Sequence, residues 1–296
     1  MALRITEFFG FQPSDVSERA VAIRATRSCP FLGQPCTKTF ADGEKSGACT
    51  VIPMTSAEVI CCANRLYAEN YKILQDVADV AFGPGARLIR PQAMASAQDR
   101  DVAVFGKRWG RELRIPQRTG GGSYFVDWIL VLLKDGGEPA EFVAVEVQSI
   151  DTTGNYRAER DAYISGQAFT QTSPAGLNWE NVSKRILPQL IYKGHVLRRE
   201  RLCLKGLFFI SPTRVYERIR KRLARNLDPL HMQPGSLTFM WYELVPHVQH
   251  GLLRSLVLKG HVTTTVDQVA LAFTAPQELP DAGVYEGAIR TALGRA

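Results

Sequence analysis

The chain has 296 residues, and its 45% hydrophobic content excludes a disordered chain and permits one large domain or two smaller ones. Its net charge of +7 at pH 7 fits a polyanionic partner, although many basic proteins bind no nucleic acid. No apolar stretch approaches the roughly 20 residues of a membrane helix, and the N-terminus lacks the pattern of a signal peptide, so we expect a cytoplasmic protein without membrane contact.

The N-terminal region is marked by its cysteines. A short helix is expected over residues 14–23, and five of the six cysteines follow it in a segment full of turn formers: Cys29, Cys36, Cys49, Cys61 and Cys62. In a cytosolic chain this clustering favours a metal site over disulfides, and a loop-rich region with little core gains stability from a tetrahedral thiolate site. No two of these cysteines are separated by the two to four residues common in such sites, so buried and inert cysteines are the alternative interpretation.

A helix and two short strands are expected next. Apolar side chains recur at near-helical spacing over residues 57–80, and the Gly-Pro-Gly sequence at 83–85 ends that pattern. Residues 87–90 and 102–105 are short apolar runs that predict strands.

Two longer apolar runs around a glycine turn predict a β-hairpin. The runs cover residues 124–133 and 141–150, and the turn contains Asp135, Gly136 and Gly137. A hairpin centred between the two glycines pairs residue 127 with residue 146.

Polar side chains meet on one face of this hairpin. Asp127 lies opposite Glu146, and Gln148 shares the face of Glu146 because strand side chains alternate, which leaves Val143, Val145 and Val147 for the core. Facing carboxylates repel each other and are costly to desolvate, and a divalent cation removes both costs. The alternative is a simply solvated face, against which stands the apolar sequence on both sides of Asp127.

The second half of the chain alternates helices and strands. Helices are expected over residues 156–169 and 178–197, the latter interrupted at Pro188, and a strand is expected over 204–210. Ser211 as N-cap and Pro212 at the first position predict a further helix with an apolar and a basic stripe. Beyond it we expect a strand over residues 237–245, a strand and a helix within 256–273, and a terminal helix over 285–293.

An Asp on one strand and Glu-x-Lys on the next, followed by a helix, is the signature of the PD-(D/E)xK nucleases. Here Gln148 stands in place of the Lys. With the cysteine-rich segment and residues 150–157, this pattern resembles the NotI branch of type II restriction endonucleases over roughly residues 25–225. The resemblance implies a mixed α/β fold (α+β), with a restriction-endonuclease-like core whose mixed central sheet is flanked by helices.

The resemblance also implies roles for residues. Asp127 and Glu146 would hold a catalytic Mg²⁺ and Gln148 would orient the attacking water, while Glu112 is a candidate accessory acid or simply an exposed strand carboxylate. Four cysteines would hold a structural metal: Cys29, Cys36, Cys49 and Cys62, with Cys61 in reserve for the last. Iron is implied by resemblance, but zinc also accepts four thiolates. Apart from the resemblance, the basic segment after residue 197 and the basic stripe of the helix after residue 211 predict contacts with DNA phosphates, unless these arginines are ordinary solvated surface: Arg198, Arg199, Arg214, Arg218 and Arg222.

Three regions are expected: a cysteine-rich metal-binding region over 1–85, the nuclease core over 86–225, and a C-terminal extension of the core over 226–296. The implied activity is Mg²⁺-dependent cleavage of double-stranded DNA at a palindromic site. The resemblance further implies a homodimer, a bacterial or archaeal host and a companion DNA methyltransferase. A metal-stabilised DNA-binding protein with a degenerate nuclease site, and a PD-(D/E)xK nuclease of repair or recombination, are the alternatives.

Overall fold

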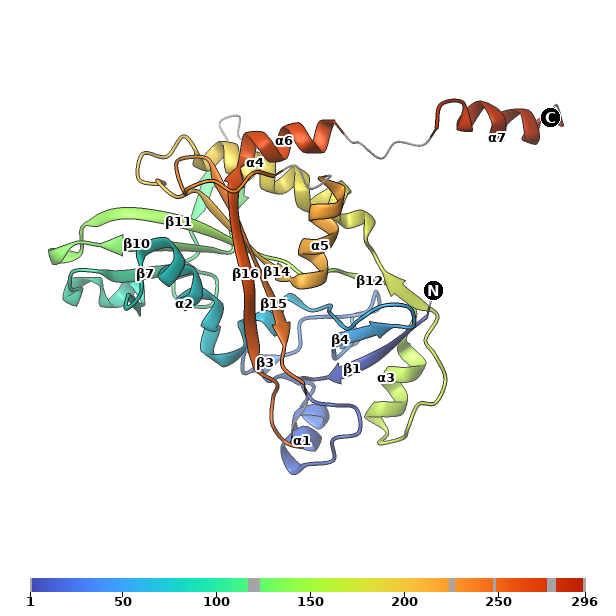
Figure 1. Ribbon diagram of the computed structural model, residues 1–296. Coiled ribbons are helices and arrows are strands. Elements are labelled where there is room, and N and C mark those ends of the chain that lie inside the picture. Colours follow the sequence, from blue (N-terminus) through green and yellow to red (C-terminus); the bar gives the residue numbers. More distant parts are fainter. Residues whose placement is uncertain (1, 117–122, 224–226, 247–248, 276–280, 295–296) are drawn as a thin grey trace.

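The computed structural model describes residues 2–116, 123–223, 227–246, 249–275 and 281–294 (Figure 1). Its centre is a sheet of seven strands: β6 (Arg87–Ile89), β7 (Asp101–Gly106), β10 (Trp128–Leu133), β11 (Pro139–Val147), β14 (Leu207–Pro212), β15 (Ser236–Leu244) and β16 (Leu256–Thr265). Their order is β16-β15-β14-β11-β10-β7-β6. The neighbours β6 and β7, β11 and β14, and β14 and β15 run parallel and the other pairs antiparallel, so the sheet is mixed.

Helices cover both faces of this sheet. On one face α2 (Ala68–Phe82) buries apolar side chains against Val143, Val145 and Val147 of β11. On the other face α4 (Leu187–Leu197), α5 (Thr213–Arg222) and α6 (Val266–Thr274) pack over Ala144 and Phe209. The expected fold class, a mixed α/β core with a central sheet flanked by helices, is confirmed.

The N-terminal region forms a separate small sheet. It is built from β1 (Leu3–Phe8), β4 (Ala48–Pro53) and β5 (Val59–Ile60), in that order. The other elements of the chain are α1 (Glu18–Thr26), β2 (Ser28–Cys29), β3 (Gln34–Pro35), η1 (Ala63–Tyr67), η2 (Pro91–Ser96), β8 (Arg114–Pro116), β9 (Ser123–Phe125), η3 (Asp135–Gly137), β12 (Thr152–Gly154), α3 (Arg157–Ile164), β13 (Ala175–Leu177), η4 (Val182–Ile186) and α7 (Val284–Ala292). None of the helices among the described residues is long and apolar enough to span a membrane.

A buried ion-pair network joins the N-terminal region to the core. The Arg65 Nε donates to Glu7 Oε2 at 2.8 Å, and Arg254 Nε donates to Glu7 Oε1 at 2.9 Å. Glu7 and Arg65 are completely buried. Removing one partner of such a network leaves an uncompensated charge and costs about 3–5 kcal/mol, so these residues fix how η1 and β1 sit against the segment before β16.

The hairpin register matches the sequence prediction. Trp128 pairs with Val145 and Leu130 with Val143, which extends to Asp127 facing Glu146. Gly136 and Gly137 both have φ of +82°, a conformation that favours glycine and closes the turn. The predicted first strand is divided, because residues up to 125 pair with β8 whereas β10 pairs with β7 and β11.

Other predicted elements differ at their ends. Residues 57–62 are not helical, because Val59 and Ile60 pair with β4. Ser211 does not cap a helix, since β14 continues through Pro212 and α5 begins at Thr213. The first helix begins after Ser17, whose hydroxyl accepts from Ala20 N. The helix expected over 156–169 ends earlier, as α3.

The remaining predicted elements are confirmed. Strands occur at β6, β7, β15 and β16, and helices at α6 and α7. The interruption expected at Pro188 takes the form of the π-helical turn η4, in which Leu187 N donates to Val182 O and Pro188 has no N–H to contribute.

Candidate active site

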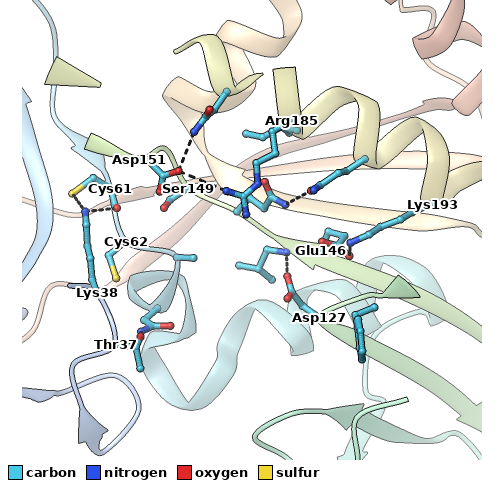
Figure 2. A pocket seen from close by; sticks show the side chains of 18 residues that line it. Thr37, Lys38, Cys61, Cys62, Asp127, Glu146, Ser149, Asp151, Arg185 and Lys193 are labelled. Atoms are coloured by element: carbon cyan, nitrogen blue, oxygen red, sulfur yellow. Dashed lines mark hydrogen bonds and ion pairs between the residues drawn. The ribbon is translucent and has the colours of Figure 1, made fainter. Parts of the chain in front are cut away.

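A cavity of about 500 Å³ lies between the cysteine-rich region and the helical segment η4–α4, with the end of β11 at its base (Figure 2). Its lining comes from these three parts of the chain: Thr37, Lys38, Cys61, Cys62, Ala63, Asn64, Phe125, Asp127, Glu146, Val147, Gln148, Ser149, Asp151, Asn181, Arg185, Ile186, Gln189 and Lys193. All three predicted catalytic residues therefore meet in one polar pocket.

Asp127 lies directly before β10, where the chain leaves the β8–β9 pair and enters the central sheet. Its Oδ2 accepts from Val147 N at 2.8 Å, which holds the carboxylate against the neighbouring strand. The side chain is open to the pocket, yet protein surrounds it elsewhere, and this desolvation raises the pKa of Asp127. The negative charge of Glu112 raises that pKa further, while the Val147 hydrogen bond and Lys193 oppose the rise.

Glu146 lies on β11, and only 3% of its surface is exposed. Burial, and then the nearby charge of Asp127, raise the pKa of Glu146 to about 7. Lys193 on α4 opposes this rise, because its Nζ donates to Glu146 Oε1. The pair of carboxylates is thus held together at the cost of mutual repulsion, which a bound cation would relieve.

Gln148 follows β11 and is anchored through its backbone, because its N donates to Ile210 O at 3.0 Å. Its Nε2 donates to Gln189 Oε1 on α4 at 3.4 Å. An amide does not titrate near neutral pH, so Gln148 can orient a water but cannot act as a base. Glu112 lies between β7 and β8, where its charge acts on Asp127, although it does not line the pocket.

Four pocket residues on the η4–α4 segment were not assigned to the site from the sequence. Asn181, Arg185, Gln189 and Lys193 all line the cavity. Figure 2 shows Arg185 and Lys193 directed toward it from the helix. Their regular spacing of four residues is the signal that could have placed them together on one helix face.

The cysteines of the N-terminal region are all buried, and none forms a disulfide. Burial raises the pKa of Cys49, and the nearby charges of Cys62, Glu7, Cys29 and Cys36 add to this rise, so Cys49 lies near the other three thiols. Burial likewise raises the pKa of Cys62 to about 12. Cys61 has a different partner, since Lys38 Nζ donates to its Sγ at 3.1 Å.

Both predicted metal sites can be tested by the chemistry of their donors. Four buried thiols without disulfides suit a thiolate metal, and two carboxylates suit Mg²⁺, which takes the rest of its ligands from water and phosphate. Among the described residues, however, no three His, Cys, Asp or Glu side chains are grouped as metal ligands. The donors fit in kind, so the four-cysteine site and the Mg²⁺ site stay predictions.

The arginines predicted to contact phosphates lie outside the pocket lining. Arg198 pairs with Asp267 at 2.6 Å, and Arg214 pairs with Glu217 at 2.8 Å. Arg218 lies over the Trp179 ring, and Arg222 donates to Phe273 O at 3.3 Å. Arg199 is exposed. The cations that line the pocket among the described residues are instead Lys38, Arg185 and Lys193.

Comparison with known proteins places this architecture in a family. A family model described as restriction endonuclease NotI matches residues 16–205. That span is well over half of the chain: it begins just before α1, contains the cysteine-rich segment with Asp127, Glu146 and Gln148, and ends just before β14. A comparison with curated proteins gives no match. The chain belongs to the restriction endonuclease NotI family and is therefore a type II restriction endonuclease, a site-specific enzyme that acts on DNA.

Proposed function

We propose that this protein is a Mg²⁺-dependent endonuclease that cuts both strands of double-stranded DNA at a palindromic site. The observation that carries the proposal is the carboxylate pair of Asp127 and Glu146, held across one hairpin in a pocket that also contains three cationic side chains. Opposed carboxylates are the oxygen ligands that Mg²⁺ prefers, and cations in the same pocket suit a phosphodiester.

The chain's own groups would divide the work of hydrolysis. Asp127 and Glu146 would hold the cation, which when bound supplies Lewis acidity toward the phosphate and the attacking water. Gln148, steadied by Gln189, would orient that water by hydrogen bonding. The water oxygen forms a bond to phosphorus and gives up a proton to solvent, while the bond from phosphorus to the sugar oxygen breaks and that oxygen takes up a proton from solvent.

The cysteine-rich region would contribute stability and one wall of the pocket. We propose that Cys29, Cys36, Cys49 and Cys62 hold one structural metal, iron by family resemblance or zinc. The choice of Cys62 rather than Cys61 as the fourth ligand is supported by the hydrogen bond that Lys38 Nζ donates to Cys61 Sγ at 3.1 Å, because that bond already occupies the Cys61 sulfur. A bound metal would favour the thiolate form that burial otherwise opposes, and would cross-link a region that has little core of its own.

A palindromic site presents the same sequence to two copies of the protein. A homodimer with a twofold axis would therefore place one pocket on each strand. An enzyme of this kind also threatens the DNA of its own host, so we propose a companion DNA methyltransferase that protects the recognition site.

The test is digestion of a genome of known sequence with and without Mg²⁺, followed by sequencing of the fragment ends. Discrete fragments sharing one palindromic sequence, formed only with Mg²⁺, are expected. Smears or nicks that depend on DNA structure would indicate a nuclease of repair or recombination. Binding to DNA without any cleavage would indicate a DNA-binding protein with a degenerate site, and both of these outcomes would refute the proposal.

A further inference from the structure

One face of the η4–α4 segment is aligned along the pocket over three turns. Residues four apart in an α-helix advance by about 40° beyond a full turn, so a row with this spacing would drift away from the cavity. The wider π turn at Val182–Ile186 counters that drift. Asn181, Arg185, Gln189 and Lys193 consequently all reach the cavity.

Two members of this row contact the carboxylate side of the site. Gln189 Oε1 accepts from Gln148 at 3.4 Å, and Lys193 Nζ contacts Glu146 Oε1 (Figure 2). The side chain of Lys193 is 17% exposed and that of Glu146 is 4% exposed, so the pair is shielded from solvent. A salt bridge this buried is weak support for a purely stabilising role, because desolvation offsets much of the attraction.

The three cations of the pocket differ in their partners. Lys38 donates to Cys61 O at 2.7 Å and to its sulfur, so it belongs to the cysteine wall. Arg185 lies 3.9 Å from Asp151 Oδ2, near the outer end of the helical row. Lys193 is the cation that contacts the carboxylate pair, and it also acts electrostatically on Asp127.

We propose that Lys193 is a catalytic residue of the DNA cleavage proposed above, and that its ammonium group contacts a non-bridging oxygen of the scissile phosphate. Gln148, two residues after Glu146 and directly after β11, is an uncharged amide, so this end of the strand offers no cation to the charge that develops on phosphorus oxygens. Lys193 supplies that charge from α4. Its contact with Glu146 places the ammonium beside the group that would hold the metal, where the phosphate must bind.

The competing role is that of a counter-ion to Glu146. In that role Lys193 would only offset carboxylate charge, and a bound divalent cation would replace it. Loss of the lysine would then tighten Mg²⁺ binding and leave the rate of bond cleavage unchanged. The two roles can therefore be distinguished by two measurements: the rate of cleavage, and the contribution of Lys193 to binding of the scissile phosphate.

The kinetic experiment compares wild type with Lys193→Met, Lys193→Gln and Lys193→Arg, with Lys184→Met as the matched control. Lys184 lies on the same segment, pairs with Glu180 and does not line the pocket. Single-turnover cleavage at saturating Mg²⁺ should slow by about 10²–10³-fold in the two neutral variants, the size of effect seen when one transition-state donor is lost. Lys193→Arg should retain part of the rate, and Lys184→Met should match wild type. Thermal unfolding and the calorimetric Mg²⁺ dissociation constant are measured for each variant.

A binding experiment detects the contact without catalysis. Binding is measured in Ca²⁺ for two duplexes, one with a normal phosphate and one with an uncharged methylphosphonate at the scissile position. The quantity compared is the dissociation constant of the methylphosphonate duplex divided by that of the phosphate duplex. Lys193→Met should reduce this ratio by about tenfold, because a hydrogen bond to a charged group is lost. If Lys193→Met does not fold, the same comparison is made with Lys193→Gln.

Cleavage within threefold of wild type in a folded neutral variant, or an unchanged binding ratio, would overturn the proposal. A wild-type protein that cuts no DNA would instead refute the proposed function, and Lys193 as a catalytic residue with it. The two failures are thus distinguished by wild-type activity.

Discussion

Two of the three parts of the chain that line the pocket are organised in different ways: the hairpin end, here called the hairpin wall, and the cysteine-rich region, here called the cysteine wall. On the hairpin wall, regular strand pairing sets Asp127 against Glu146, and backbone and side-chain contacts hold both carboxylates. On the cysteine wall, Cys29 lies on a two-residue strand, Cys49 lies on β4 and the other thiols lie in connecting segments; all are buried, and within the described part of the chain no three of them are grouped as metal ligands. A sheet can thus pre-form a site before its ion binds, whereas a loop-rich segment depends on its ion for the final geometry.

The largest expected effect concerns the pre-formed wall. Asp127→Ala and Glu146→Ala should each lower the cleavage rate by at least about 10²–10³-fold, because the cation loses a ligand, while DNA binding persists. The rates are measured on a supercoiled plasmid with Mg²⁺, and duplex binding is measured in Ca²⁺. Full activity in both variants would remove the assignment of the carboxylate pair.

Substitutions in the cysteine wall should lower the stability of the folded protein. Replacing Cys29, Cys36, Cys49 or Cys62 with Ser should release one metal per chain and weaken folding by several kcal/mol, since structural metal binding is coupled to folding. Elemental analysis of protein purified without a His-tag and thermal unfolding measure both effects. Cys61→Ser and Cys203→Ser serve as controls and should be mild.

Two outcomes would change this account of the cysteine wall. Folded, active wild-type protein without iron or zinc would rule out the structural metal. Metal loss in Cys61→Ser but not in Cys62→Ser would reassign the fourth ligand to Cys61.

The repulsion between the carboxylates predicts a dependence on pH. In the metal-free folded protein the pKa of Glu146 is about 7, above its ordinary value of 4.5. The stability that protonated Glu146 contributes is therefore fully present below pH 4.5 and is lost as the pH rises from 4.5 to about 7. Glu146→Gln should therefore stabilise the metal-free protein at pH 8 by about 2 kcal/mol more than at pH 5. Denaturant unfolding at the two pH values measures the difference, and an equal effect at both would contradict the shifted pKa.

The smallest effect is expected at Arg218 and Arg222, which do not line the pocket. Replacing Arg218 and Arg222 with Ala should lower the slope of log affinity against log salt by about 0.9 for each lost phosphate contact, on specific and random duplexes alike. Lys259→Ala, on β16, is the control for a change of charge alone. An unchanged slope would leave these arginines as ordinary surface, and a loss confined to the specific duplex would mean that they read bases.

Much of the hairpin wall could be predicted from the sequence, because strand alternation and a glycine turn determine which residues face each other. Lys193 could not be assigned, since it reaches Glu146 from a helix 47 residues away and one sequence does not say which helix face meets the sheet. The predicted cap at Ser211 was wrong for a related reason: pairing with β15 keeps Ser211 and Pro212 in the strand. Tertiary pairing overrode the local signal.

The arrangement of Arg65, Glu7 and Arg254 was likewise beyond a sequence argument. Three charged residues far apart in the chain meet in a buried network that joins the N-terminal region to the segment before β16. Charged residues read from sequence are expected at the surface, so burial of these three depends on the pairing that only the fold supplies.

Anomalous diffraction from crystals grown with Mn²⁺ and bound duplex would locate the ions of both walls in one experiment. We expect a manganese peak between the carboxylates of Asp127 and Glu146, beside a DNA phosphate, and a second metal among Cys29, Cys36, Cys49 and Cys62. A duplex bound away from this pocket, with no manganese at the carboxylate pair, would contradict this expectation.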